Sequence, residues 1–202
     1  VGKALDATVN DVLMACAAGA LRAYLLERGD EVDGLTIRAT VDPDMQAEAA
    51  SALQTALEKY DRGLGVWRGT RKVIPSEKLA SEADWRAALS AEEVPRDLLD
   101  WYPAVVLAVG ETDARIGIEG LPDEGQTIPA EDVTWARKRL PDGSLAKRAK
   151  VAGDLVSVGD VVMVTELANE DGTPKRWSLR QVPEVEGGFM AMDVNTGRVI
   201  AM

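Results

Sequence analysis

The feature that most constrains the fold of this chain is a change of hydrophobic period at Pro103. Beyond this residue, apolar side chains recur at every second position, in short runs that turn residues separate. Successive side chains of a strand point to opposite faces of a sheet, so this period predicts half-buried β-strands. Residues 105–109 and 115–119 form the first two runs. A turn over residues 111–113 joins them as a predicted hairpin.

The same pattern continues towards the C-terminus. A short strand is predicted in "QTIPAEDVTWAR", and "PDG" at residues 141–143 predicts a turn. The run "VGDVVMV" predicts a strand that begins after a Gly-Asp turn at residues 159–160, and "RWSLRQV" is the strand that returns. Residues 189–193 and 198–202 predict a terminal hairpin. Several short strands at this spacing indicate a small OB-like β-barrel.

The first part of the chain follows a helical period instead. An apolar stripe over residues 8–28 predicts a helix with Thr8 as N-cap and Gly29 as its stop. Residues 35–41 alternate between apolar and polar side chains, which predicts a half-buried strand.

A second helix is predicted to open at Asp42 and Pro43, because Asp is a preferred N-cap and Pro suits the first helical position. Its apolar stripe continues to Tyr60, and Gly63 is predicted to follow its end. Residues 64–100 predict a short helix near residues 82–88 and no regular sheet. The chain is therefore predicted to be α+β, with N-terminal helices followed by a small OB-like β-barrel and a terminal β-hairpin.

Composition excludes several classes of site. The chain of 202 residues has 23 Lys and Arg against 34 Asp and Glu, and this net charge of −11 opposes binding to nucleic acid. Histidine is absent, which excludes Ser-His and Cys-His nucleophile pairs. The single cysteine, Cys16, excludes an internal disulfide and argues against a structural zinc site. No apolar run approaches the roughly 18 residues that span a bilayer, and no signal peptide is evident.

Three patterns resemble functional motifs, and we interpret each as structural. The tetrad "SLAK" at residues 144–147 fits Ser-x-x-Lys but follows a turn, which favours a solvated basic loop. The "NTG" at residues 195–197 lacks a preceding Lys and favours a hairpin turn. The tryptophans are typical of core residues, although a ligand-stacking surface is the alternative: Trp67, Trp85, Trp101, Trp135 and Trp177. We predict no catalytic, cofactor-binding or metal-binding residues and no cofactor.

A family resemblance runs from about Gly34 to the end of the chain. It is carried, in order, by "TIRATVDPDMQAEAASAL", "YDRGLG", "WYPAVVLAV", "DVTWARK", "VGDVVMV" and "WSLRQVPEVEGGFMAMDVNTGRVIAM". The chain thus resembles a class A penicillin-binding protein, a bifunctional peptidoglycan synthase. The resemblance implies the region between the two catalytic modules, with the glycosyltransferase and its membrane anchor expected before Gly34 and the transpeptidase nucleophile expected beyond Met202. It also implies the periplasmic side of the bacterial inner membrane.

A second resemblance covers residues 1–41. The phrases "VGKALDATVNDVLMACAAGALRAYLLERG" and "DGLTIRATV" are similar to a C-terminal segment of bacterial wax ester synthase/diacylglycerol acyltransferases, with Asn10-Asp11 matching a family motif. A structural role for this pair, at a helix start, is the interpretation we favour. A natural fusion, an engineered chimera or a sequence-assembly artefact would each produce such a join.

These readings predict four segments and three alternative functions. The segments are an acyltransferase-like helix and strand (residues 1–41), a linker helix and irregular region (42–101), the OB-like barrel (102–187) and the first hairpin of a transpeptidase domain (188–202).

The favoured function is a non-catalytic accessory domain of the synthase. Its expected partners are the neighbouring catalytic domains and, further, a protein activator or a glycan, with no nucleic acid and no membrane segment. The alternatives are an acyltransferase fragment and a free-standing protein- or glycan-binding OB module.

Overall fold

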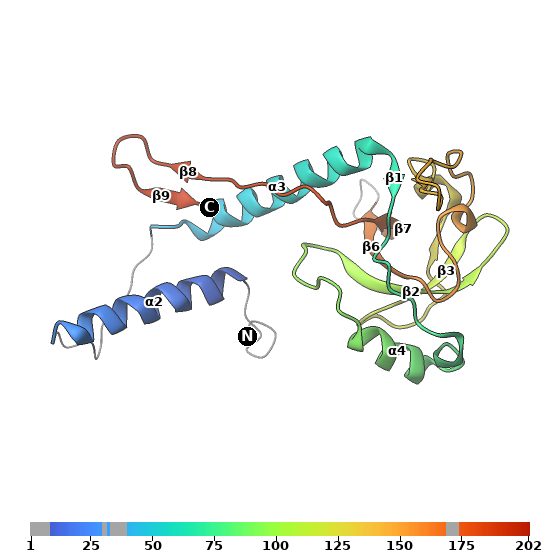
Figure 1. The fold of residues 1–202 in the computed structure, drawn as a ribbon, viewed down its shortest axis with the longest axis horizontal. Helices are drawn as coiled ribbons and strands as arrows, with labels where there is room; N and C mark the ends of the chain where they lie inside the picture. The colour runs from blue at the N-terminus through green and yellow to red at the C-terminus, as the bar shows by residue number, and fades with distance from the viewer. Residues whose placement is uncertain (1–8, 30–31, 33–39, 169–173) are drawn as a thin grey trace. The chain divides into compact units, whose positions relative to one another are not determined.

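The chain divides into two compact units, which we describe separately from a computed structural model. One unit consists of residues 1–46 and 190–202, and the other of residues 47–189 (Figure 1). The structure describes residues 9–29, 32, 40–168 and 174–202.

The larger unit is built around one five-stranded antiparallel sheet. Its strand order is β4-β3-β2-β6-β7, and the outer strands β4 and β7 approach each other. The sheet therefore curls into a nearly closed barrel, which removes most of its free edges. This arrangement confirms the predicted α+β fold with an OB-like barrel. The strands are β2 (Tyr102–Val109), β3 (Ala114–Ile118), β4 (Thr127–Ile128), β6 (Val161–Ala168) and β7 (Pro174–Arg180).

Strand β2 is buried on both of its faces. Ala104 and Val106 pack inside the barrel, whereas Val105 packs on its outer side against Trp85 of helix α4 (Glu82–Ala91). A strand with two covered faces needs apolar residues on both. The run "AVVLAV" therefore lacks the clean alternation that a half-buried strand shows.

Helix α4 covers the outside of the barrel because a glycine lets it approach. The Ser81 side chain caps the helix by accepting the Asp84 N–H at 3.2 Å, in agreement with the helix predicted near residues 82–88. Trp85 lies over strand β3, and a Cβ added at Gly117 would stand only 2.7 Å from the Trp85 ring. A larger residue at Gly117 would therefore force the Trp85 ring to move.

Helix α3 (Pro43–Leu64) opens as predicted but ends later than predicted. The Asp42 carboxylate accepts two backbone N–H groups of the first turn, at 3.0 and 3.1 Å. The prediction that Gly63 follows the helix end is wrong, because the helix continues through Gly63. The chain leaves the helix at Gly65, which has a φ of 66°.

The prediction of no regular sheet within residues 64–100 is also wrong. Strand β1 (Val66–Trp67) pairs in parallel with strand β5 (Arg137–Lys138). Two-residue strands leave almost no periodic signal, and this pairing joins segments that are far apart in the sequence. It places the residues that follow β1 beside those that follow β5.

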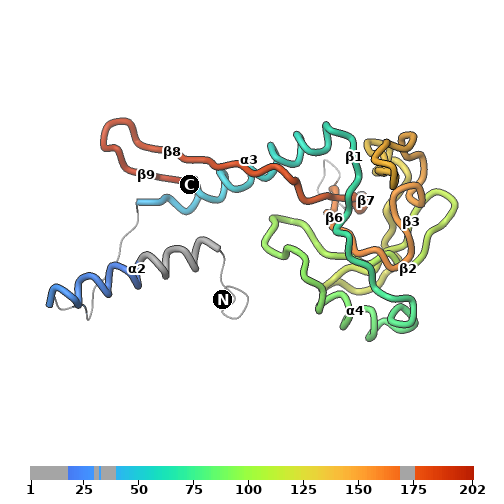
Figure 2. The backbone as a smooth tube through the Cα atoms, viewed as in Figure 1, coloured from blue at the N-terminus to red at the C-terminus, as the bar shows by residue number. Residues whose placement is uncertain are grey.

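The segment that leaves the barrel, residues 181–189, runs back along helix α3 (Figures 1 and 2). A Cβ added at Gly187 would lie 3.2 Å from Leu53 and 3.3 Å from Leu57, both on that helix. The chain therefore enters and leaves the larger unit at the same end.

The smaller unit contains helix α2 (Val9–Glu27) and the terminal hairpin of β8 (Ala191–Met192) and β9 (Val199–Ala201). The helix confirms the prediction for residues 8–28, and Gly29 follows it with a φ of 79°. The hairpin also exists as predicted, although its paired strands are shorter.

Two predictions for this unit fall partly or wholly outside the described residues. The Thr8 cap lies outside them, as do residues 35–39 of the predicted strand. Thr40 and Val41 are described and are not in a strand.

Candidate functional site

A buried polar junction fastens helix α3 and the exit segment to the barrel. Asp61 of α3, with 1% of its side chain exposed, accepts a hydrogen bond from Arg68 Nη2 at 2.5 Å. Its second carboxylate oxygen accepts the Gln181 Nε2 amide at 2.7 Å. Gln181 also donates to the Val66 carbonyl and accepts the Arg68 backbone N–H at 2.6 Å. Helix α3, the residues that follow β1 and the exit segment thus meet at one satisfied buried carboxylate, although Gln181 lies 120 residues from Asp61 in the sequence.

A second layer of charged side chains surrounds this junction. Glu58 of α3 lies 3.1 Å from Arg180 Nε and 3.8 Å from Arg62 Nη1. Arg62 donates to the Leu179 carbonyl at 3.0 Å, and its guanidinium stacks 4.5 Å above the Trp135 ring. Burial, and then the neighbouring positive charge of Arg180, lower the pKa of Arg62 from its usual value. The inner face of α3 is therefore held to the barrel by polar contacts.

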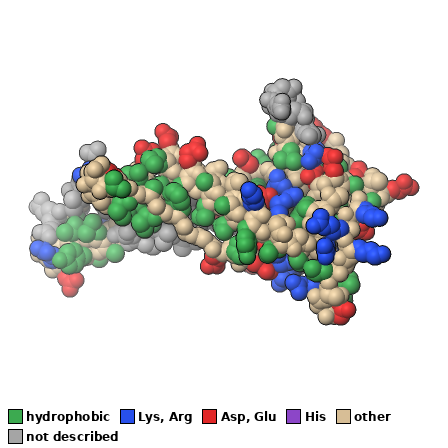
Figure 3. Space-filling view, turned by 90° about the horizontal axis from the view of Figure 1, so that it is seen from above, with side chains coloured by type: hydrophobic (Ala, Val, Ile, Leu, Met, Phe, Trp, Pro, Cys, Tyr) green, Lys and Arg blue, Asp and Glu red, His purple; other side chains and the backbone are tan. Residues whose placement is uncertain are grey.

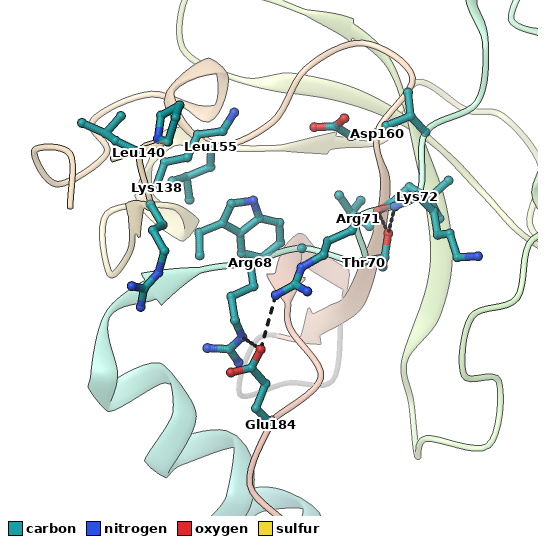
Figure 4. A pocket seen from close by; sticks show the side chains of 16 residues that line it. Arg68, Thr70, Arg71, Lys72, Lys138, Leu140, Leu155, Asp160 and Glu184 are labelled. Carbon is teal, nitrogen blue, oxygen red and sulfur yellow. Dashed lines mark hydrogen bonds and ion pairs between the residues drawn. The ribbon is translucent and has the colours of Figure 1, made fainter. Parts of the chain in front are cut away.

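Arg68 also binds the exit segment directly. Its Nε lies 3.2 Å from a carboxylate oxygen of Glu184, and its Nη2 lies 3.5 Å from the Val182 carbonyl. Arg71 Nη2 approaches the same Glu184 oxygen at 3.5 Å. Figure 4 shows both guanidinium groups reaching this carboxylate from one segment of the chain.

Beside the junction opens a pocket of about 790 Å³, which we call the basic pocket. Its walls come from the residues after β1, the residues after β5 and the start of β6, so the β1–β5 pairing creates it. It is lined by five basic and two acidic side chains, namely Arg68, Arg71, Lys72, Lys138, Arg139, Asp160 and Glu184. On the face seen in Figure 3, Lys and Arg side chains gather over the larger unit, although the chain carries a net charge of −11.

The structure places the motifs at residues 144–147 and 195–197 outside this site. Ser144 and Lys147 lie in a non-helical loop, where the Ser144 hydroxyl donates to Asp142 at 2.7 Å. That hydrogen bond, together with the Ser144 N–H, lowers the pKa of Asp142. The 195–197 motif forms the turn of the terminal hairpin.

The tryptophans divide between the two apolar clusters of the larger unit. Trp67, Trp85 and Trp101 are buried, whereas Trp135 and Trp177 pack against the barrel core while partly exposed. Trp67 meets Trp135 edge to face, with ring centroids 6.3 Å apart. The described packing thus supports the interpretation that the tryptophans are core residues.

Sequence reasoning missed the residues of the junction. One signal was present: Asp61 follows Leu53 and Leu57 at intervals of four along the helix, which places it on the buried face. Its partners Arg68 and Gln181 carry no local signal, because their contacts are set by the tertiary fold.

The described part of the chain contains neither a candidate metal site nor a candidate membrane span. No group of three or more Cys, Asp or Glu side chains in these residues is arranged to hold a metal ion. No described helix combines the length and the apolar character needed to cross a membrane.

The sequence was compared with known protein families. Residues 67–185, which include the barrel, the basic pocket and the junction residues Arg68 and Gln181, match the family described as "Penicillin-binding protein OB-like domain". The chain belongs to this family. The match identifies the larger unit as a penicillin-binding protein OB-like domain, as the class A resemblance implied.

Similar proteins carry a consistent name. The chain is 33% identical over 168 residues to "Penicillin-binding protein 1A" of Rickettsia typhi, covering 83% of this chain and 18% of that protein. It is 30% identical over 187 residues to the protein of that name from Vibrio cholerae, covering 90% and 22%. The chain thus spans about a fifth of the length of these relatives.

A solved structure shares the fold. The crystal structure of Penicillin-Binding Protein 1A from Haemophilus influenzae aligns with 91% of this chain and 24% of its own, with a TM-score of 0.59 and 20% identity.

The acyltransferase resemblance of residues 1–41 finds no support in these comparisons. The Vibrio match covers 90% of the 202 residues and leaves about 20 outside it, so it includes part of residues 1–41. The second resemblance rested on one helix and one predicted strand, and a helix rich in Ala and Leu is compatible with many folds. The four predicted segment boundaries remain predictions.

Proposed function

We propose that the chain is the non-catalytic accessory domain of a bifunctional peptidoglycan synthase, in which it spaces or regulates the glycosyltransferase and transpeptidase modules. The observation that carries this proposal is the junction of Asp61, Arg68 and Gln181. It ties the entry helix and the exit segment to the barrel at one point.

The junction suits a spacer because it fixes both connections of the domain. A module attached through helix α3 is held to the barrel by Asp61 and Glu58. A module attached through the exit segment is held by Gln181 and Glu184. Since Arg68 takes part in both sets of contacts, a change in one connection is transmitted to the other through a single side chain.

The proposed setting follows from the family. The relatives are named Penicillin-binding protein 1A, and we place the domain on the periplasmic side of the bacterial inner membrane. Its partners there are the catalytic domains of the same synthase, and a protein activator is a further candidate for its open surface.

An experiment on the full-length synthase tests the spacing role. Two variants are needed: Arg68→Met, which breaks the junction, and an insertion of Gly-Gly-Ser after Gly187, which lengthens the exit without touching it. Both should lower the ratio of peptide cross-links to glycan polymerised by at least about twofold, a coupling loss of about 0.4 kcal/mol. Arg115→Met, which removes an exposed ion pair on β3, is the matched control. An unchanged ratio in both variants would refute the proposal.

The non-catalytic assignment has its own test on the chain of 202 residues. Incubation with a β-lactam should give no covalent adduct by intact-mass measurement, because Ser144 and Lys147 do not share a helix turn. A stoichiometric adduct that Ser144→Ala abolishes would show that this loop is a working nucleophile site.

A further inference from the structure

We infer that the basic pocket is a binding site for an acidic, extended peptide segment of a partner protein. This inference deepens the proposed function, since it names the chemistry of a partner. It is tested separately, because the protein variants that should weaken peptide binding, at Arg71 and Lys138, leave the contacts of Asp61 with Arg68 and Gln181 in place.

The first support is a carboxylate that already occupies the pocket. Glu184 belongs to the irregular exit segment, and it lies against both Arg68 and Arg71. Its side chain is 65% exposed. Guanidinium groups recognise carboxylates through paired, directional hydrogen bonds. Glu184 thus shows the kind of group that the pocket recognises, a carboxylate on an irregular backbone segment. Because most of its side chain is exposed, a carboxylate of a partner can replace it.

The second support is unused positive charge. Among the described residues, Lys138 and Arg139 have no ion-pair partner, and both are exposed. Arg71 is 76% exposed and shares its single carboxylate with Arg68. In a chain of net charge −11, a pocket with more basic than acidic side chains attracts an anionic ligand locally while the rest of the surface repels it.

The third support is the backbone that presents these groups. Gly69 and Arg71 adopt left-handed φ angles of 61° and 60°. For Arg71 this conformation is unfavourable, and such residues concentrate at ligand-binding sites. The resulting turn brings Arg68 and Arg71 to the same side, while Lys72 points away from them (Figure 4).

The rim of the pocket favours a peptide over a plain polyanion. Val73 and Leu140 line it with 58% and 42% of their surface exposed. A sulfated or phosphorylated glycan offers no apolar side chain to cover them, whereas a peptide that alternates acidic and apolar residues pairs with both kinds of group. The pocket volume of about 790 Å³ accommodates several such side chains.

A binding experiment uses the chain of 202 residues and a short fluorescein-labelled peptide of alternating Glu and Leu, followed by fluorescence anisotropy. Replacing each Glu of the peptide by Gln should weaken binding by at least about tenfold, and so should Arg71→Glu or Lys138→Glu in the protein. Glu184→Gln should tighten binding by about threefold or more, since it removes the internal competitor. Lys78→Glu is the matched control, because it makes the same charge change on an exposed residue outside the pocket, and it should alter binding less than about twofold.

Four results would overturn the inference. Absence of binding is one, and an equal effect of Arg71→Glu and Lys78→Glu is another, since it would mean that only net charge matters. Failure of Glu184→Gln to tighten binding would show that its carboxylate does not occupy the binding site. Equal affinity for heparin, or for a peptide with Ser in place of Leu, would identify a general polyanion site instead.

Discussion

The buried pair of Asp61 and Arg68 predicts an unequal cost for removing its two partners. Arg68→Met leaves the Asp61 carboxylate buried with one hydrogen bond, from Gln181. Breaking a buried ion pair in this way costs about 3–5 kcal/mol. Asp61→Asn leaves Arg68 with Glu184 at 3.2 Å and with 12% of its side chain in water. We expect this variant to cost about 1–2 kcal/mol, the cost of one weakened buried hydrogen bond.

Urea unfolding followed by tryptophan fluorescence measures this difference. All five tryptophans lie within residues 67–177, so the signal reports on the larger unit alone. With a slope of about 2 kcal/mol per molar urea, Arg68→Met should lower the midpoint by about 2 M and Asp61→Asn by about 0.5–1 M. The double variant should cost less than the sum by about 1–3 kcal/mol, because it leaves no unpaired buried charge.

The variant Arg71→Met is the control for this series. Arg71→Met removes the exposed cation that shares Glu184, and it should change the free energy of unfolding by less than about 0.5 kcal/mol. Equal costs for Arg68→Met and Asp61→Asn, or strict additivity of the two, would show that the junction is not a coupled buried pair.

Three further predictions concern other parts of the chain. Gly117→Ala should destabilise the larger unit by about 1–3 kcal/mol by pushing Trp85 out of place, and a change within about 0.5 kcal/mol in urea unfolding would contradict this packing. The Asn195 N–H holds the pKa of Asp193 below its ordinary value, so this carboxylate stabilises the terminal hairpin above about pH 4 and the contribution is lost as the pH falls through the lowered pKa. Amide exchange in the hairpin should therefore accelerate on acidification relative to the intrinsic rate, and unchanged protection at pH 2 would speak against it. Deletion of residues 1–33 should leave the melting temperature of the larger unit almost unchanged, because they belong to the other unit, whereas a fall of more than about 5 °C, or roughly 1 kcal/mol, would show that they support its core.

Several elements followed from the sequence because their causes are local. The Asp42 carboxylate caps α3 with an atom only two and three residues away from its partners. The hairpin of β2 and β3, and the turn at residues 141–143, depend on residues that are neighbours in the chain. The end of α3 was misplaced by two residues, because both Gly63 and Gly65 can follow a helix and only the observed backbone distinguishes them.

Segments without a periodic signal were decided by tertiary packing. The two-residue strands β1 and β5 pair although they lie some 70 residues apart in the sequence. Such long-range pairings depend on the apolar surface that they bury and not on local preference. The continuous apolar run of β2 is explained only when α4 is seen to cover its outer face.

The sequence by itself determined the fold class, the family and most turns, since helical and strand periods and glycine conformations act over a few residues. Only the tertiary structure brought Asp61, Arg68 and Gln181 together and placed Glu184 against the basic pocket. The physical reason is the range of the forces involved. A buried carboxylate needs hydrogen-bond donors within about 3 Å once water is excluded, and the folded structure decides which donors reach it. Spacing along the chain therefore does not predict these partners.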